Sequence, residues 1–305
     1  MEKILIPISE ASKISGVDDK NIYRWIDEGK IRYYEEDKKK VIDKIEFLQS
    51  IPTVITNFIR KGGVGKTTIS YVLADYFEYI GLNVLLVDLD PQANLTSTFF
   101  TFEEIKDKPT LYNYFIDNTA LNKIVLKYNE KIDILINDIR LDDAIDIDST
   151  VIYSDYLDPF KSLFKKYQIV IIDCPPAINT FSRTGVMLSN YVLFPLQPEP
   201  YSLQGINEAF KSLTQLKKLA DNFIDYKAFI NTFVKRKIII RDDMEENFRN
   251  VLKDKLLNGK LYESTDFIER ILLKENLFKS KREKNSIKEA LKLCNEIFDV
   301  IYTKR

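Results

Sequence analysis

An apolar, β-branched run, TVITNFI, leads into a glycine-rich loop that is followed at once by a helix-forming stretch. The loop, residues 60–68, reads RKGGVGKTT, and its end matches the phosphate-binding pattern G-x-x-x-x-G-K-[ST]. The pattern expects a glycine where Arg60 stands, and a second lysine, Lys61, precedes the glycines. Because such a loop presents backbone N–H groups at the N-terminus of a helix, this order of elements favours an α/β fold with a nucleotide site.

The chain continues as short apolar runs separated by helical stretches. The runs occupy residues 83–90, 132–137, 167–174, 191–197 and 226–233. Near-continuous apolar strands that alternate with helices indicate a parallel sheet with both faces covered. The final stretch, residues 285–305, has its apolar residues on one side of an amphipathic helix. We therefore expect a doubly wound, mostly parallel α/β sheet of the P-loop NTPase type over residues 50–305.

Residues 1–49 have a different pattern. They predict a short helix that ends at Gly16, a second helix between Asp18 and Gly29, and a hairpin followed by a closing helix. Two helices joined by a tight turn, with apolar positions that can share one small core, are typical of a helix-turn-helix. A unit this small is marginal alone, so we expect it to pack on its neighbour. Ile51-Pro52 marks the boundary, which predicts domains at 1–49 and 50–305.

The composition excludes several classes of protein. The chain has no histidine, which removes Ser-His-Asp and Cys-His catalysis and histidine-based zinc sites. Its two cysteines, Cys174 and Cys294, have neither metal-ligand spacing nor a disulfide framework. A run of about 18 apolar residues and a secretory signal pattern are both missing, so we expect a cytoplasmic protein. With a net charge of -1, any contact with DNA must come from local basic patches.

Aspartates follow two of the apolar runs, at the edge of the sheet where ligands bind in this class of fold. Asp173 ends one run, and Asp88 and Asp90 end another, where both can face the same cleft because alternate strand residues point to the same side. Lys66 is suited to neutralising the β- and γ-phosphates and Thr67 to binding Mg²⁺, which Asp173 can hold through water. Taken singly, each aspartate is equally well explained as the cap of a loop or helix.

The segments KGGVGKTT, LLVDLDPQANLT, VIIDCPP and FPLQPEPYSLQGI together resemble the ParA/MinD family of deviant Walker-A ATPases, and most closely its ParA partition proteins. The resemblance runs from about Thr53 to the C-terminus. It departs from the family at Ile59-Arg60, where Asn-Gln is usual, and over residues 268–287. It implies a slow ATPase that uses ATP and Mg²⁺ and forms a homodimer with the nucleotides sandwiched between the subunits.

The resemblance also implies roles for individual residues. Lys61 would be the signature lysine that reaches the partner subunit's phosphates, Asp90 would position the attacking water, and Asp173 would be the Walker-B acid. The implied catalytic residues are Lys61, Lys66 and Asp90, and the implied metal residues are Thr67, Asp88 and Asp173. The implied nucleotide-binding residues are Lys61, Gly62, Gly63, Val64, Gly65, Lys66, Thr67, Thr68, Asn231 and Thr232, with the last two near the adenine.

DNA and a second protein are the partners that the resemblance implies. In the family, the ATP-bound dimer binds DNA without sequence preference and associates with the nucleoid, and a ParB-like centromere-binding protein accelerates hydrolysis. Two basic stretches are therefore candidates for phosphate contacts. They contain Lys235, Arg236, Lys237, Lys279, Lys281 and Arg282, although a solvated charged face is an equally good explanation of each.

Residues 1–49 resemble the excisionase/MerR-type helix-turn-helix, which implies binding to an operator and autorepression. Lys20, Asn21, Tyr23 and Arg24 would lie on the recognition helix. A small dimerisation or packing module is the alternative for this unit. For the whole chain, the alternatives are a MinD-like ATPase that binds membranes through a C-terminal amphipathic helix, and a DNA-binding repressor with a regulatory nucleotide site.

Overall fold

The computed structural model describes most of the chain. The described residues are 3–15, 17–36, 39–144, 156–198, 210–218, 220, 223–232, 238–262, 264–279 and 284–303, of which 232 and 238–242 are described by their backbone alone. In this part of the chain, no helix is both long and apolar enough to cross a lipid bilayer.

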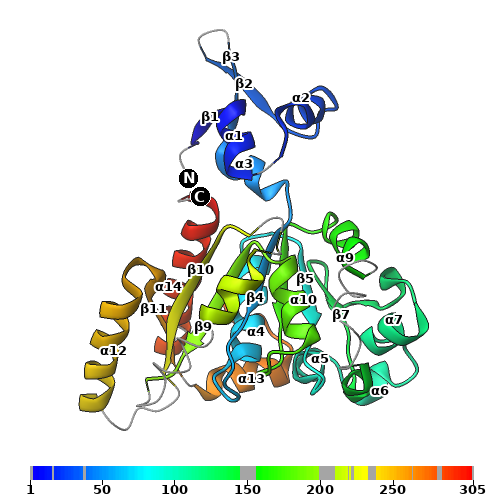
Figure 1. Cartoon of the computed structure of the whole chain (residues 1–305), viewed down its shortest axis with the longest axis vertical. Coiled ribbons are helices and arrows are strands. Elements are labelled where there is room, and N and C mark those ends of the chain that lie inside the picture. Colours follow the sequence, from blue (N-terminus) through cyan, green and yellow to red (C-terminus); the bar gives the residue numbers. More distant parts are fainter. Residues whose placement is uncertain are drawn as a thin grey trace.

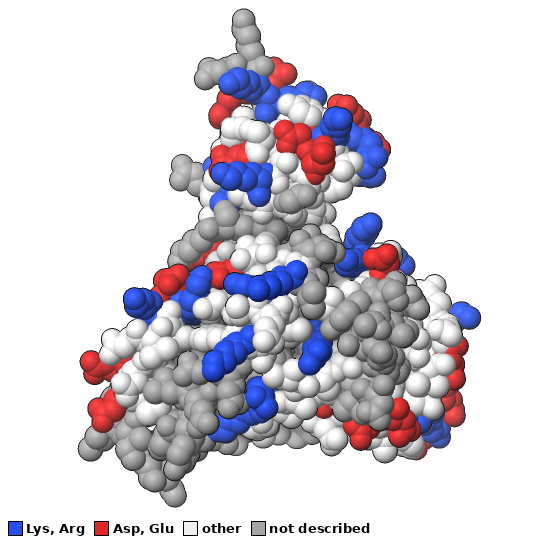
Figure 2. Space-filling model, viewed as in Figure 1, with Lys and Arg blue, Asp and Glu red and all other residues white. Residues whose placement is uncertain are grey.

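The N-terminal residues form a small α/β unit that stands apart from the larger body in Figure 1. Its antiparallel sheet has the order β1-β3-β2. The predicted helices, hairpin and closing helix are all present, and Asp18 caps the second helix by accepting a hydrogen bond from the Lys20 N–H at 2.7 Å. Side chains of both charges are interspersed over this unit in Figure 2. The elements are β1 (Leu5–Pro7), α1 (Ile8–Ser15), α2 (Asp19–Asp27), β2 (Tyr33–Glu36), β3 (Lys39–Asp43) and α3 (Lys44–Gln49).

The larger body contains an eight-stranded sheet with the order β11-β10-β9-β4-β8-β5-β7-β6. Every recorded pairing is parallel except that between β6 and β7, which confirms the predicted doubly wound, mostly parallel sheet. The strands are β4 (Thr53–Asn57), β5 (Val84–Asp88), β6 (Val125–Lys127), β7 (Ile132–Leu135), β8 (Ile169–Asp173), β9 (Tyr191–Leu196), β10 (Asp225–Thr232) and β11 (Leu256–Tyr262).

Helices cover both faces of this sheet (Figure 1). The connection from β4 to β5 and the one from β8 to β9 run in opposite directions along the strand order, so right-handed crossovers put α4 and α10 on opposite faces. The helices are α4 (Lys66–Tyr79), α5 (Asn94–Phe99), α6 (Phe102–Ile105), α7 (Leu111–Asp117), α9 (Leu157–Phe164), α10 (Thr180–Leu188), α12 (Ile238–Leu252), α13 (Thr265–Leu273) and α14 (Asn285–Phe298).

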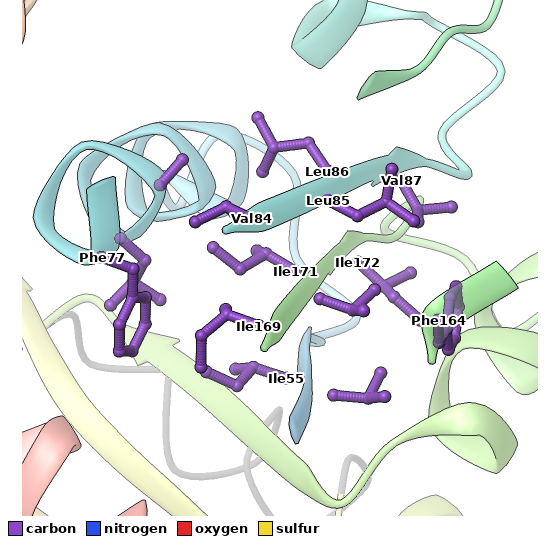
Figure 3. Close-up of a cluster of buried hydrophobic side chains, with 14 of the residues drawn as sticks. Ile55, Phe77, Val84, Leu85, Leu86, Val87, Phe164, Ile169, Ile171 and Ile172 are labelled. Atoms are coloured by element: carbon purple, nitrogen blue, oxygen red, sulfur yellow. The ribbon is translucent and has the colours of Figure 1, made fainter. Parts of the chain in front are cut away.

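The central strands form the core of the body. Every residue of β4, β5, β8 and β9 is buried, as the near-continuous apolar runs predicted. Figure 3 shows aliphatic side chains of β4, β5 and β8 packed together, with the rings of Phe77 and Phe164 at the two sides of the cluster. The sheet therefore provides a rigid base for the loops that follow its carboxyl ends.

The N-terminal unit is joined to the end of the chain. Lys44 of α3 is buried, and its Nζ donates a hydrogen bond to the Thr303 carbonyl oxygen at 2.9 Å. Residue 303 ends a short π-helical turn (Asp299–Thr303) that packs against α3, and Phe47 and Tyr302 belong to the same buried apolar cluster. The amphipathic helix α14 leads into this turn and packs against β11 and α4. Its apolar side is thus covered by the protein itself.

Candidate nucleotide-binding site

The glycine loop connects the end of β4 to the start of α4. Gly63 and Gly65 have φ angles of 69° and 82°, in the left-handed region that glycine adopts without steric cost. Gly65 is the residue that precedes the first turn of α4, so the loop arrives at a helix N-terminus whose N–H groups are available to an anion. At Gly63 an added Cβ would meet nothing within 4 Å, so the backbone angle, and not crowding, is what requires glycine there.

Amide side chains from neighbouring strand ends hold this loop. Asn231, at the end of β10, donates from Nδ2 to the Val64 carbonyl oxygen at 2.7 Å, and Gln197, just beyond β9, donates from Nε2 to the Gly63 carbonyl oxygen at 3.2 Å. Sequence reasoning predicted Asn231 near the adenine with Thr232, whose side chain is not among those described. Gln197 belongs to the segment FPLQPEPYSLQGI of the family resemblance, but its contact with the loop was not predicted because it depends on the strand order.

The two lysines of the loop have different surroundings. Lys66 is buried, and its Nζ donates to the Lys61 carbonyl oxygen at 3.1 Å. Burial lowers the pKa of Lys66, an effect that the charges of Asp173 and Asp90 oppose. Lys61 itself is only partly buried, and Arg60 beside it is exposed. Lys66 therefore lies close to the aspartates of its own site, whereas Lys61 is partly exposed.

A hydroxyl and a carboxylate lie together at the ends of α4 and β8. Thr67 donates from Oγ1 to Asp173 Oδ2 at 2.6 Å. Asp173 is fully buried, and this burial raises its pKa to about 7 against the opposing effects of Thr67 and Lys66. Its second oxygen, Oδ1, has no hydrogen-bond partner among the described residues. A buried acceptor of this kind is costly unless a cation or a water satisfies it.

These residues fit a magnesium nucleotide. The described residues contain no cluster of three acidic, cysteine or histidine side chains that could form a protein-only metal site. Mg²⁺ usually keeps several waters and takes one or two protein ligands together with phosphate oxygens. Thr67 Oγ1 and the second oxygen of Asp173 supply that kind of donor set beside the phosphate-binding loop.

The other two aspartates belong to the loop between β5 and α5. Asp88 lies beside Asp173 on the adjacent strand and is fully buried, which raises its pKa to about 8, with the charge of Asp173 adding to the effect. Its Oδ2 accepts hydrogen bonds from Thr96 N at 2.7 Å and Thr96 Oγ1 at 2.8 Å, and its Oδ1 accepts one from Asp90 N at 3.3 Å. Asp88 therefore holds the loop together, and its predicted metal role is untested. Asp90 is buried, and its Oδ1 accepts a hydrogen bond from Gln92 N.

Only some of the predicted DNA-binding residues are among those that the structure describes. On α2, Lys20, Tyr23 and Arg24 are exposed and Asn21 is half-buried, while Ile22 and Ile26 of the same helix are buried. Lys279 is exposed but forms an ion pair with Glu78 at 2.6 Å. Lys235, Arg236, Lys237, Lys281 and Arg282 lie outside the described residues.

A further basic surface was missed by sequence reasoning. Figure 2 shows Lys and Arg side chains across the middle of the body's near face, with most acidic side chains toward its rim. Helix α10 and the helical residues 210–216 lie on this face in Figure 1, and both pack into one apolar cluster. We use the name basic face for the exposed cations of these two segments and of the residues that follow, Arg183, Lys211, Lys217 and Lys218, for which no ion pair within the described residues is recorded. Arg183 is distant in the sequence from the other three, so no sequence pattern linked the four.

Comparison with known proteins identifies the class and then the family. A family model described as an AAA domain matches residues 52–226. The sporulation initiation inhibitor protein Soj of Bacillus subtilis is 29% identical over 205 residues, which cover 66% of this chain and 80% of Soj. The virulence plasmid ParA family protein pGP5-D of Chlamydia psittaci is 24% identical over 247 residues, which cover 80% of this chain and 93% of that protein.

Solved structures share the fold. A putative plasmid partition protein of Borrelia burgdorferi bound to AMPPNP superimposes with a TM-score of 0.66 at 22% identity, covering 82% of this chain and 99% of that one. The ATP complex of a Cyanothece McdA variant gives a TM-score of 0.70 at 18% identity, covering 81% and 96%. The sheet, the loop and the matched segment define a P-loop ATPase. The chain belongs to the AAA-domain family, and within it to the ParA type that its motifs predicted.

Removing the charge of Asp173 tests the magnesium site. Asp173→Asn keeps an acceptor for Thr67 but loses the carboxylate, so we expect the apparent Mg²⁺ affinity of the ATP complex to fall roughly 10- to 100-fold. The measurement is a Mg²⁺ titration of a fluorescent ATP analogue bound to the protein. With EDTA, wild type and variant should bind the analogue equally. Asp133→Asn, in which the changed carboxylate accepts a hydrogen bond from Tyr167 instead, is the control. Unchanged Mg²⁺ affinity in Asp173→Asn would rule out this site.

Proposed function

We propose that the chain is a DNA-partition ATPase that forms a dimer with two molecules of Mg-ATP between the subunits. The dimer binds DNA and releases it after ATP hydrolysis. The observation that carries this proposal is the pair of lysines in one loop. Lys66 is buried near Asp173 and Asp90, so it can neutralise the phosphates of the nucleotide that its own subunit binds. Lys61 is partly exposed, and in this proposal it reaches the phosphates bound by a second subunit. Similarity to Soj and to plasmid ParA proteins supports the same role.

Each residue of the site has a task in this proposal. The backbone N–H groups of residues 62–66 bind the phosphates, and Thr67 and Asp173 hold Mg²⁺, which when bound supplies charge neutralisation at the phosphate oxygens. Asp90 orients the attacking water. A single loop and a single carboxylate leave much of the transition-state charge uncompensated, so slow turnover is expected until a ParB-like partner assists.

Lys61→Ala tests the contribution across the dimer. We expect the variant to remain a monomer with ATP, because the partner's phosphates would lack their second lysine. Light scattering after size-exclusion chromatography is the measurement. Asp90→Ala, with hydrolysis blocked, should accumulate dimers with ATP. Arg60→Ala, which changes the neighbouring exposed cation, is the matched control and should dimerise as wild type does. A stable ATP-dependent dimer of Lys61→Ala would refute the role of Lys61.

The basic face is the proposed DNA-binding surface. Its four cations are exposed, and none forms an ion pair within the described residues, whereas Lys279 pairs with Glu78. Cations of this kind neutralise phosphates without reading bases, which suits DNA of any sequence. Their position on one face of the body would allow the two faces of a dimer to contribute together.

Salt dependence tests this surface. We expect ATP-dependent binding to a random duplex, with an affinity that falls steeply as salt is added. Replacing Arg183 and Lys217 by alanine should weaken binding at low salt and reduce the slope of log K against log[salt] by about 1 for each phosphate that is no longer neutralised. Lys127→Ala, at the far edge of the sheet where Lys127 pairs with Glu130, should change neither quantity. An affinity for the duplex that changes neither with added salt nor with the nucleotide, or that fails to change with one of them, would contradict the proposal.

For the N-terminal unit we propose operator binding through α2. Its buried Ile22 and Ile26 anchor the helix, so Lys20, Tyr23 and Arg24 present one exposed side to a groove. Footprinting on DNA upstream of its own gene should give a protected region with ATP or ADP, lost in Tyr23→Ala/Arg24→Ala and kept in Lys13→Ala, on the exposed side of α1. No protection with wild type would favour the alternative, a packing module.

A further inference from the structure

We propose that Asn137 is a positioning residue for hydrolysis, because it fixes the backbone of the loop that carries Asp90. This inference rests on the role proposed for Asp90 above. Asn137 ends the apolar run 132–137 just after β7 and is fully buried, and sequence reasoning assigned it no role. Its function would be to keep the Asp90 carboxylate at one place relative to Lys66.

Asn137 is bonded to the loop at two points. Its side-chain Nδ2 donates to the Asp90 carbonyl oxygen at 2.8 Å. Its backbone N–H donates to Thr96 Oγ1 at 2.9 Å, and that hydroxyl donates in turn to Asp88 Oδ2 at 2.8 Å. The order of donors and acceptors is fixed, since the Thr96 proton is used on Asp88 and its lone pair accepts from Asn137. One residue that follows β7 thus ties both the start and the end of the loop.

The loop needs such a tie because it is strained. Ala93 has a φ of 51°, in the left-handed region that is unfavourable for a non-glycine residue. The Ala93 N–H donates to the Asp90 carbonyl oxygen at 2.8 Å, and the same oxygen accepts from Asn137. Strained residues persist only where their surroundings over-determine them. The bond from Asn137 supplies a constraint from outside the loop.

The geometry also explains why the change should affect chemistry more than folding. Without Asn137 Nδ2, the Asp90 carbonyl oxygen keeps its bond from Ala93, so no buried acceptor is left unsatisfied. The backbone of Asp90 is then held by one hydrogen bond fewer, so its carboxylate is positioned less well. Because a misplacement of about 1 Å at a reacting centre can cost on the order of 100-fold in rate, a smaller shift at Asp90 should be visible in kcat.

The neighbouring residue provides a matched control. Asp138 accepts a hydrogen bond from the buried Thr110 Oγ1 at 2.6 Å, in the same turn after β7. That bond holds the start of α7 and does not touch the Asp90 loop. Thr110→Val therefore removes a partly buried hydrogen bond that is made to the residue next to Asn137.

The experiment compares steady-state and single-turnover ATP hydrolysis with nucleotide affinity for each variant. Asn137→Ala should lower kcat about tenfold while KM and the affinity for a fluorescent ATP analogue stay within about twofold. Thr110→Val should leave kcat and KM unchanged, even if its melting temperature falls as much as that of Asn137→Ala. If Asn137→Ala does not fold, Thr96→Val takes its place, and Thr96→Ser, which keeps the hydroxyl, should recover most of the lost rate.

The outcomes separate this inference from the proposal on which it rests. Asp90→Ala should abolish hydrolysis. If Asp90→Ala hydrolyses ATP normally, the role of Asp90 is wrong and the inference falls with it. If Asp90→Ala is inactive while Asn137→Ala keeps full kcat, the inference alone is overturned. Equal reductions of kcat in Asn137→Ala and Thr110→Val would also overturn it, because a general structural effect would then explain both.

Discussion

The register of three parallel strands determines what the site can do. Asn57, Asp173 and Asp88 lie opposite one another on β4, β8 and β5, so three polar side chains meet at one carboxyl edge of an otherwise apolar sheet. The aliphatic residues beneath them, visible in Figure 3, pack together in this register, and a shift of one strand by one residue would move its polar residue out of line with the other two. The hydrophobic core therefore places the carboxylates, and the loops only refine their positions.

Burying so much charge has a physical consequence for the nucleotide-free protein. Burial raises the pKa of Asp88 to about 8 and that of Asp173 to about 7, and lowers the pKa of Lys66. Neutral forms of the two carboxyl groups are thus within reach near neutral pH. A bound phosphate and a cation would restore the charged forms by supplying the missing partners. Ligand binding and the ionisation of the site are in this way coupled. Asp88 also supports the loop from inside, through its hydrogen bonds with Thr96.

Sequence reasoning recovered what depends on local pattern. The phosphate loop, the central strands, the aspartates and the helices of the N-terminal unit all follow from periodicity, glycines and strand ends. It missed β6, which is a short antiparallel edge strand, and β11, whose run LLNGKLY contains a glycine and a lysine. It also missed every feature that depends on strand order: the bond of Gln197 to the loop, the basic face assembled from α10 and residues 210–218, and the hold of Asn137 on Asp90. Residues distant in the sequence carry no shared pattern for such contacts.

The bond between Lys44 and Thr303 bears on how the chain is made. The N-terminal unit precedes the ATPase body in the chain, yet α3 completes its packing against residues 299–303, which follow that body. Apolar side chains such as Phe47 must therefore wait, unprotected by their final neighbours, until the whole ATPase body has been translated. An N-terminal unit that packed only on itself could complete its folding before the ATPase body is made. Here its packing partner at residues 299–303 is made only after that body.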